Sequence, residues 1–137
     1  MPVVVDVSVA AKWFLSDERS GFANSILEQI AREGAYVPAL FIWEIQNVLL
    51  SAERAVRVTS NEVDEALEAL ESLPIFVEAV PQRPRSGIEL QLARHYRLTS
   101  YDAAYLALAA QRRIALATCD AKLSRAGRDL GVTLLAP

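Results

Sequence analysis

The sequence predicts an α/β fold: a single domain with a parallel β-sheet of about five short strands and helices on both faces. Short apolar runs rich in β-branched residues, without polar alternation, recur along the chain, which is typical of strands buried on both faces. The longer segments between them have helical periodicity, and helices provide the crossover connections that parallel strands require. The chain of 137 residues contains no repeat, linker or low-complexity tract, so we expect one domain over residues 1–137.

The first half of the chain is predicted to contain two strands and four helices. Gly34 is placed to end the second helix, and Pro38 stands where the next helix opens. Thr59 followed by Glu62 has the spacing of a capping box, which marks the start of the fourth helix. The expected strands are residues 3–5 and 36–37, and the expected helices are residues 8–15, 20–33, 39–55 and 61–72.

The second half is predicted to contain three strands and three helices. Thr99 and Asp102 have capping-box spacing at the start of a helix rich in Ala and Leu. Tyr101, Tyr105 and Leu108 form an apolar stripe on this helix, which predicts that it is firmly buried. The expected strands are residues 75–77, 114–118 and 132–135, and the expected helices are residues 86–96, 99–109 and 122–130.

The composition indicates a cytoplasmic protein without membrane attachment. Hydrophobic residues make up 53% of the chain and the mean hydropathy is +0.20, yet no apolar run approaches the ~20 residues that a membrane span needs. The N-terminus has no basic leader, so we expect no secretory signal. The single cysteine, Cys119, fits a reducing compartment and is most simply a buried filler. A self-associating face is the simplest use for the apolar surplus.

The charge is unevenly distributed. The formal net charge of -3 argues against a general nucleic-acid coat. Residues 1–78 hold 13 acids and 5 bases, whereas residues 79–137 hold 4 acids and 9 bases. The basic side chains of the second part, Arg83 and Arg85 among them, could attract phosphates, although most such residues simply lie on solvated helix faces.

Four acids interrupt strongly apolar surroundings. Asp6 and Asp120 follow predicted strands, Asp102 lies in the first turn of a buried helix, and Glu44 lies one and a half turns into another. Taken singly, each could be a helix cap or mark the wet side of a helix. In an open parallel sheet, however, ligands bind beyond the carboxyl ends of the strands, and four carboxylates meeting there would repel one another without a cation between them. We therefore expect a divalent metal site.

The available ligands favour Mg²⁺, with Mn²⁺ as a substitute. Hard carboxylate oxygens suit these ions, and the single His95 and single Cys119 cannot build a zinc site. Ser8, Asn47 and Thr118 are candidate supporting residues, which would hold the carboxylates by hydrogen bonds or touch phosphate. The same residue types are common as caps and loop residues.

Four blocks of sequence in order also resemble a known family, the PIN-domain ribonucleases, and within it the VapC-type toxins of bacterial and archaeal toxin–antitoxin pairs. The resemblance covers essentially the whole chain. The blocks are Val4-Val5-Asp6-Val7-Ser8 with Lys12-Trp13, Pro38-Ala39-Leu40-Phe41-Ile42-Trp43-Glu44-Ile45-Gln46-Asn47-Val48-Leu49, Thr99-Ser100-Tyr101-Asp102-Ala103-Ala104-Tyr105-Leu106-Ala107-Leu108-Ala109, and Thr118-Cys119-Asp120 with Leu123.

The resemblance implies a PIN-like domain that cuts RNA as a metal-dependent endoribonuclease. The acids of the family pattern fall on Asp6, Glu44, Asp102 and Asp120, and none is missing. Asp6 and Asp102 are then the expected direct ligands, and the other two complete the site, bind a second ion or orient the water. The resemblance further implies a toxin that dimerises, cleaves a structured cellular RNA and is silenced by a cognate antitoxin protein.

Two alternatives stay open on sequence grounds. A phosphoacceptor signalling domain of the receiver type also places acids around magnesium, but it needs an aspartate after a central third strand, where this chain has Glu78-Ala79-Val80. It also needs an acid pair after the first strand, where only Asp6 is present. The second alternative is a catalytically inactive PIN-like module that binds RNA.

Overall fold

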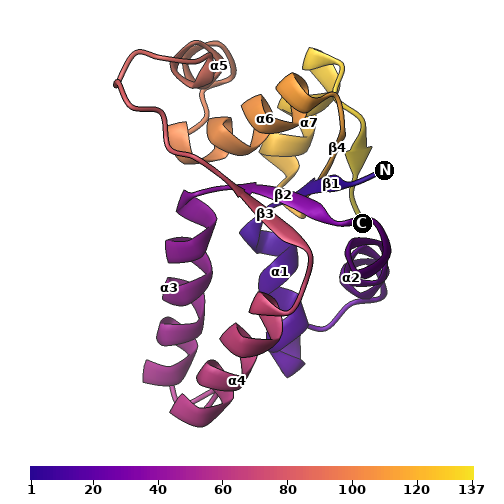
Figure 1. Cartoon of the computed structure of the whole chain (residues 1–137), viewed down its shortest axis with the longest axis vertical. Helices are drawn as coiled ribbons and strands as arrows, with labels where there is room; N and C mark the ends of the chain where they lie inside the picture. The colour runs from indigo at the N-terminus through magenta and orange to yellow at the C-terminus, as the bar shows by residue number, and fades with distance from the viewer.

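The computed structural model describes residues 1–137 and contains a five-stranded, fully parallel β-sheet with the strand order β3-β2-β1-β4-β5 (Figure 1). The α/β class and the parallel sheet predicted from the sequence are therefore confirmed. The strands are β1 (Val3–Val5), β2 (Ala35–Pro38), β3 (Ile75–Glu78), β4 (Ala115–Ala117) and β5 (Leu134–Leu135).

Helices cover both faces of the sheet, as predicted. In Figure 1, α1 to α4 lie below the sheet and α5 to α7 lie above it. A short 3-10 helix, η1 (Ser16–Glu18), joins the first two α-helices, in the segment between the predicted helices 8–15 and 20–33. The helices are α1 (Val7–Phe14), α2 (Gly21–Glu33), α3 (Leu40–Arg54), α4 (Ser60–Glu71), α5 (Glu89–Tyr96), α6 (Ser100–Arg112) and α7 (Ala121–Leu130). None of these helices is long and apolar enough to cross a bilayer.

The main boundary error concerns α5, which begins at Glu89 and not at residue 86. The segment before it contains Pro81 and Pro84, and Gly87 has a φ of +84°, a backbone conformation that a right-handed helix excludes. Residues 79–88 therefore form a connecting loop between β3 and α5. The strand β5 is likewise shorter than the predicted residues 132–135.

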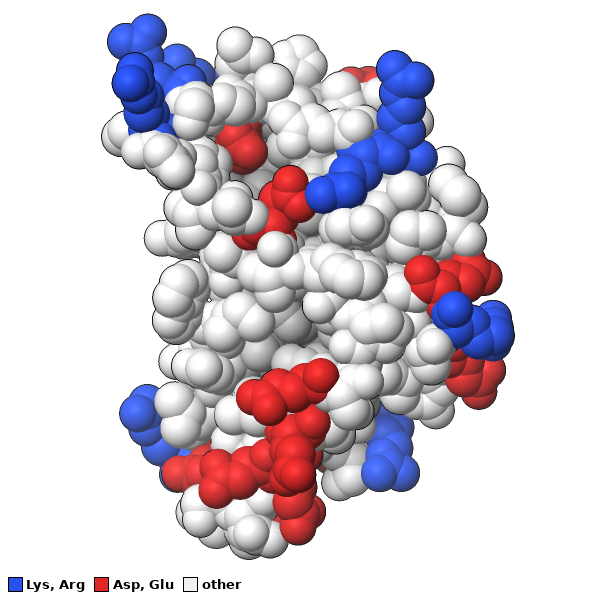
Figure 2. Space-filling model, viewed as in Figure 1, with Lys and Arg blue, Asp and Glu red and all other residues white.

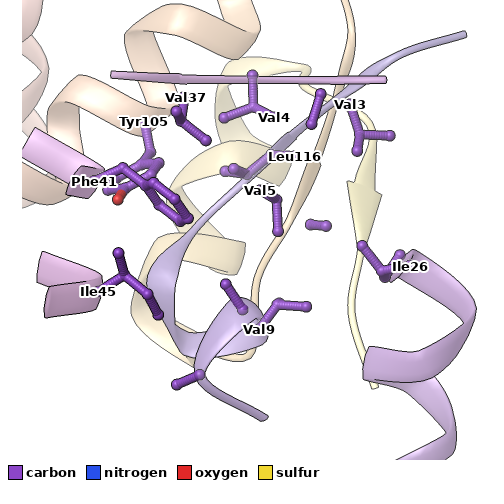
Figure 3. Packing of buried hydrophobic residues seen from close by; sticks show 14 of the residues in the cluster. Val3, Val4, Val5, Val9, Ile26, Val37, Phe41, Ile45, Tyr105 and Leu116 are labelled. Carbon is purple, nitrogen blue, oxygen red and sulfur yellow. The ribbon is translucent and has the colours of Figure 1, made fainter. Parts of the chain in front are cut away.

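The core lies on both sides of the central strand β1. All three residues of β1 are buried, because β1 is the central strand of a sheet whose two faces are covered by helices. Figure 3 shows Val3, Val4 and Val5 surrounded by apolar side chains from the helices, with Tyr105, Phe41 and Val37 at one end of the core. The helix α6 is buried along most of its length, although Tyr101 in its first turn is 62% exposed and so departs from the predicted stripe.

The strand order puts the first and fourth strands side by side. Going outward from β1, one half of the sheet continues with β2 and β3, and the other half continues with β4 and β5. The order of the chain thus reverses between β1 and β4, and in open parallel sheets the crevice at such a switch point is where ligands bind. The backbone confirms how close the two carboxyl ends are, since Asp6 N–H donates to the carbonyl of Ala117 over 3.1 Å.

This order does not match that of the receiver alternative. A receiver domain has the strand order 2-1-3-4-5, in which the third strand is central. Here β3 is an edge strand, and the exposed Phe76 and Val77 leave it only half covered. The carboxyl end of β3 therefore lies at the margin of the sheet, away from the switch point.

Candidate active site at the carboxyl edge of the sheet

Asp6 lies at the centre of the switch point, immediately after β1. Its side chain is 5% exposed and is the N-cap of α1, where Oδ1 accepts the backbone N–H of Ser8 over 2.9 Å. The hydroxyl of Ser8 also donates to Oδ1, and the hydroxyl of Thr118 donates to Oδ2. Both carboxylate oxygens are therefore held in a fixed orientation.

Burial and hydrogen bonding act on Asp6 in opposite directions. Loss of hydration disfavours the charged form and raises the pKa of Asp6, while the donors Ser8 and Thr118 partly offset this rise. A raised pKa in spite of these donated hydrogen bonds shows how strongly the burial disfavours the negative charge. A cation bound beside Asp6 would relieve that cost.

Asp120 is tied to Asp6 through the strand end of β4. The backbone N–H of Asp120 donates to Thr118 Oγ1 over 3.0 Å, and the N–H of Cys119 donates to Ser8 Oγ over 2.9 Å. Ser8 and Thr118 thus each connect Asp6 to the loop after β4. Asp120 itself is the N-cap of α7, accepting the N–H of Leu123 on Oδ1 over 2.9 Å.

Asp102 lies in the first turn of α6 and faces the same edge. Its backbone N–H donates to Thr99 Oγ1 over 3.0 Å, so Thr99 is the N-cap that the sequence predicts. Burial raises the pKa of Asp102, and the negative charge of Asp120 raises it further. The effect of Asp120 shows that these two carboxylates lie within electrostatic reach of each other.

Glu44 reaches the edge from α3 and is held by Tyr105 of α6. The hydroxyl of Tyr105 donates to Glu44 Oε1 over 2.6 Å. Burial is the largest cause that raises the pKa of Glu44, this hydrogen bond lowers it, and the charges of Asp102 and Asp6 raise it again. Glu44 is therefore electrostatically coupled to two other members of the set.

The four predicted acids thus belong to one edge of the sheet, where the pKa values of Glu44 and Asp102 respond to the charges of the other acids. None of them forms an ion pair with a Lys or Arg side chain. No group of three or more Asp, Glu, His or Cys side chains is close enough to make a ready metal site. The positive charge of Lys122 acts on Asp102 without forming an ion pair and offsets only part of this negative charge. An all-oxygen donor set of this kind fits a hard divalent cation.

Asn47, a predicted supporting residue, lies apart from the hydrogen-bond network. It is exposed on α3 and lines a cavity of about 490 Å³ together with Ser8, Lys12 and Cys119. Burial, the larger effect, raises the pKa of the Cys119 thiol while Lys12 lowers it, so the ammonium group lies near this half-buried cysteine. Of the three supporting residues, Ser8 and Thr118 contact a carboxylate, and Asn47 does not.

Sequence reasoning missed the contact of Tyr105 with Glu44. The sequence pattern places this residue only on the buried stripe of α6, and it is indeed 1% exposed. Tyr105 lies three residues after Asp102, and this spacing puts both side chains on the same face of the helix. This spacing is the feature of the sequence that could have pointed to Tyr105. The acceptor, Glu44, lies 61 residues earlier in the chain, so the contact itself has no local signal.

A second, larger cavity opens next to the acidic edge. It has a volume of about 740 Å³ and lies between the start of α3, the loop 79–88 and α6. Its lining includes the large, exposed side chains of Trp43, Val80, Leu90 and Tyr101. Trp43 and Tyr101 are direct sequence neighbours of Glu44 and Asp102, although none of the four candidate acids lines this cavity.

Fold and site together define a class: a parallel α/β domain with an acidic edge suited to a divalent cation. The chain belongs to the PIN domain family, whose sequence model matches residues 3–129. It is 32% identical over 128 residues to Ribonuclease VapC3 of Mycobacterium tuberculosis, an alignment that spans 90% of this chain and 86% of that protein. The family resemblance inferred from the sequence is thereby confirmed.

Solved structures agree with the fold. PAE2754 from Pyrobaculum aerophilum superposes with a TM-score of 0.67 at 18% identity, covering 98% of this chain and 90% of that one. FitAcB from Neisseria gonorrhoeae superposes with a TM-score of 0.64 at 18% identity, covering 97% of this chain and 96% of that one. At this level of identity the likeness concerns the fold alone.

Proposed function

We propose that this protein is an endoribonuclease that depends on Mg²⁺, or Mn²⁺ in its place, and is the toxin of a type II toxin–antitoxin pair. The observation that carries the proposal is the set of four coupled carboxylates, none paired with a basic side chain, at the switch point of a PIN domain. The similarity along most of the chain to a protein named as a ribonuclease supports RNA as the substrate.

Asp6, Glu44, Asp102 and Asp120 are the residues that would hold one or two divalent ions. A bound ion of this kind lowers the pKa of a water molecule and stabilises the charge that develops on the phosphate oxygens. Asp6 and Asp102 are the proposed direct ligands, and Glu44 and Asp120 complete the site, bind a second ion or orient the water.

The supporting residues act by orientation. Ser8 and Thr118 donate to the two oxygens of Asp6, so the carboxylate cannot rotate away from the edge. Asn47 has no side-chain hydrogen bond within the chain and lines the cavity beside Ser8, where it is available to a substrate phosphate. The neutral hydroxyls supply hydrogen bonds without adding positive charge that would compete with the metal.

The proposed partners are an RNA substrate, a cognate antitoxin protein that covers the acidic edge, and a second copy of the chain. The exposed apolar surface of Trp43, Val80, Leu90 and Tyr101 supports the homodimer, because monomers rarely leave such a patch uncovered. With cellular RNA as substrate, the proposed location is the cytoplasm.

The first prediction is that the purified protein cleaves RNA only with Mg²⁺ or Mn²⁺, since the site has no nitrogen or sulfur ligands for other metals. The measurement is gel analysis of an RNA mixture incubated with Mg²⁺, Mn²⁺ or EDTA. Asp6→Ala and Asp102→Ala should reduce the rate more than Ser8→Ala, for which a loss of about 10- to 100-fold is typical of a supporting residue.

The same variants are the control for a contaminating nuclease, because a contaminant would cut RNA at the same rate in the preparations of the parent and of the variants. Cutting that persists in excess EDTA, or at equal rates in the parent and both Asp variants, contradicts the proposal. RNA binding without any cleavage would identify the inactive, RNA-binding alternative.

A further inference from the structure

The contact between Tyr105 and Glu44 joins the two helices that flank the acidic edge. Tyr105 is among the largest fully buried side chains of the core, and its hydroxyl meets Glu44 Oε1 over 2.6 Å. Figure 3 shows Tyr105 at the end of the core that also contains Phe41 and Val37. The ring therefore belongs to the core, while the hydroxyl belongs to the site.

The buried hydroxyl group of Tyr105 calls for an explanation. A phenylalanine would fill the same space without a polar atom to satisfy, since a buried hydroxyl without a partner costs about 1–3 kcal/mol. The hydroxyl has only this one hydrogen bond, and its acceptor is a member of the carboxylate set. It also lies close enough to Asp6 and Asp102 for their charges, after burial and Glu44, to raise the pKa of Tyr105.

The hydrogen bond divides the two oxygens of Glu44 between two tasks. Oε1 accepts from Tyr105, and Oε2 has no hydrogen-bond partner within the chain. Since a tyrosine hydroxyl is neutral, it orients the carboxylate without neutralising it, which a Lys or Arg at the same place would do.

We propose that Tyr105 is a positioning residue of the nuclease site, whose hydroxyl fixes Glu44 Oε1 and leaves Oε2 as the oxygen that serves the divalent ion or the attacking water. The inference rests on the proposed function. It adds a residue of α6 to the site and makes the geometry of Glu44 depend on the position that the core gives to Tyr105.

The chain offers a matched control in Tyr96. Its hydroxyl also donates to a carboxylate, that of Asp129, over 2.8 Å, but on the surface between α5 and α7. Tyr96→Phe and Tyr105→Phe therefore delete the same kind of hydrogen bond in two places. Only the second deletion touches the proposed site.

The test measures metal binding without RNA as well as cleavage. Mn²⁺ titration followed by electron paramagnetic resonance of the free ion should show about tenfold weaker binding for Tyr105→Phe and unchanged binding for Tyr96→Phe. In cleavage assays at saturating Mn²⁺, Tyr105→Phe should lower kcat by about 10- to 100-fold with little change in KM, because the hydroxyl does not contact RNA.

A double-mutant cycle asks whether Tyr105 acts through Glu44. If it does, Tyr105→Phe lowers kcat in the parent and has no further effect once Glu44→Ala is present. If the two substitutions instead lower kcat by independent factors that multiply in the double variant, the inference is overturned and Tyr105 belongs to the core alone. If Tyr105→Phe fails to fold, Glu44→Asp withdraws the carboxylate from the hydroxyl and leaves the core intact, and full Mn²⁺ affinity in that variant would overturn the inference equally.

The failure of the inference and the failure of the proposed function give different results. If Glu44→Ala loses activity while Tyr105→Phe binds Mn²⁺ and cuts RNA like the parent, the ribonuclease stands and the positioning role is wrong. If the parent does not cut RNA at all, the proposed function fails, and the Mn²⁺ titration still decides whether Tyr105 supports a metal site.

Discussion

A single carboxylate can cap a helix and belong to a metal site at the same time. Asp6 and Asp120 are both N-caps in the structure, which is one of the two explanations that the sequence leaves open, and both lie at the switch point of the sheet. Asp120 uses only Oδ1 for the N–H of Leu123. The capping and metal-binding interpretations of such an acid are therefore compatible, and only removal of its charge distinguishes them.

Asp102→Asn is the residue-scale prediction. The cap of α6 comes from Thr99, so this substitution would remove a charge and leave the cap in place. In EDTA at pH 7 we expect the variant to be as stable as the parent, or more stable by about 1 kcal/mol once solvent and salt screening are allowed for. Mg²⁺ should then stabilise the parent more than the variant. Urea unfolding in EDTA and in Mg²⁺ measures both effects.

The pH dependence of this difference follows from the raised pKa of Asp102. The folded protein holds this proton more tightly than the unfolded chain, so the parent loses stability as the pH rises from the ordinary value of 3.8 through the raised one. The advantage of Asp102→Asn should therefore appear over that window. If the variant instead loses about 0.3–1 kcal/mol with and without Mg²⁺, Asp102 serves only the helix dipole.

The element that organises the site is α6. Its first turn carries Asp102, its next turn carries Tyr105, and most of its remaining length is buried against the sheet. Because α6 is held by the core, it gives both side chains a fixed position relative to β1. The loop 79–88, by contrast, is exposed almost throughout. It carries Arg83, which lines the apolar cavity, and Arg85, which lies two residues further along the chain.

The element-scale prediction concerns this loop. Figure 2 shows positive side chains at the upper left, the part of the molecule that contains α5 and the preceding loop, while acidic side chains gather over α4 below. If Arg83 and Arg85 contact RNA phosphates, replacing both by Gln should reduce the slope of log affinity against log salt by about 1–2. Binding of catalytically inactive protein to RNA at several salt concentrations measures the slope.

The control for the loop variant is the pair Arg32→Gln and Arg113→Gln. These residues precede β2 and β4 and therefore lie at the opposite, amino-terminal edge of the sheet. They change the net charge by the same amount, so a general effect of charge would alter both slopes. An unchanged slope for the Arg83 and Arg85 variant would place these arginines on a solvated surface.

On the scale of the whole molecule, the unusual feature is the apolar surface beside the site. Trp43 is 64% exposed and Val80 is 62% exposed, in a protein whose core is already well filled. A second copy covering this surface would bring two acidic edges close together. Dimerisation and substrate access would then be linked.

Trp43→Ser should accordingly shift the protein from dimer to monomer, because aromatic anchors at the centre of an interface commonly contribute about 2 kcal/mol or more, roughly a 30-fold change in affinity. Light scattering coupled to gel filtration over a range of protein concentrations measures the shift. Leu130→Ser removes a partly exposed leucine at the far end of α7 and should leave the oligomeric state unchanged. A parent that is monomeric at all concentrations would contradict the homodimer.

The sequence by itself determined the order of most strands and helices, the parallel sheet and which four acids are candidates for the site. These follow from local patterns. Apolar runs predict β1 and β4, and N-cap residues at Thr59 and Thr99 mark the starts of two helices. The candidate acids follow a strand or lie within a helix that is otherwise apolar. Local patterns failed where competing signals overlapped, as at Pro84 and Gly87, which delay the start of α5.

Only the tertiary structure decided which strand ends are neighbours and which side chains meet there. The strand order places Thr118 against Asp6, although the two are 112 residues apart, and the packing of α6 brings Tyr105 to Glu44. Such contacts depend on how the helices pack on the sheet, and the burial that raises the pKa of Asp6 arises from all of the surrounding elements together. Neither the contacts nor the burial can be read from a short stretch of sequence, because both are set by long-range packing.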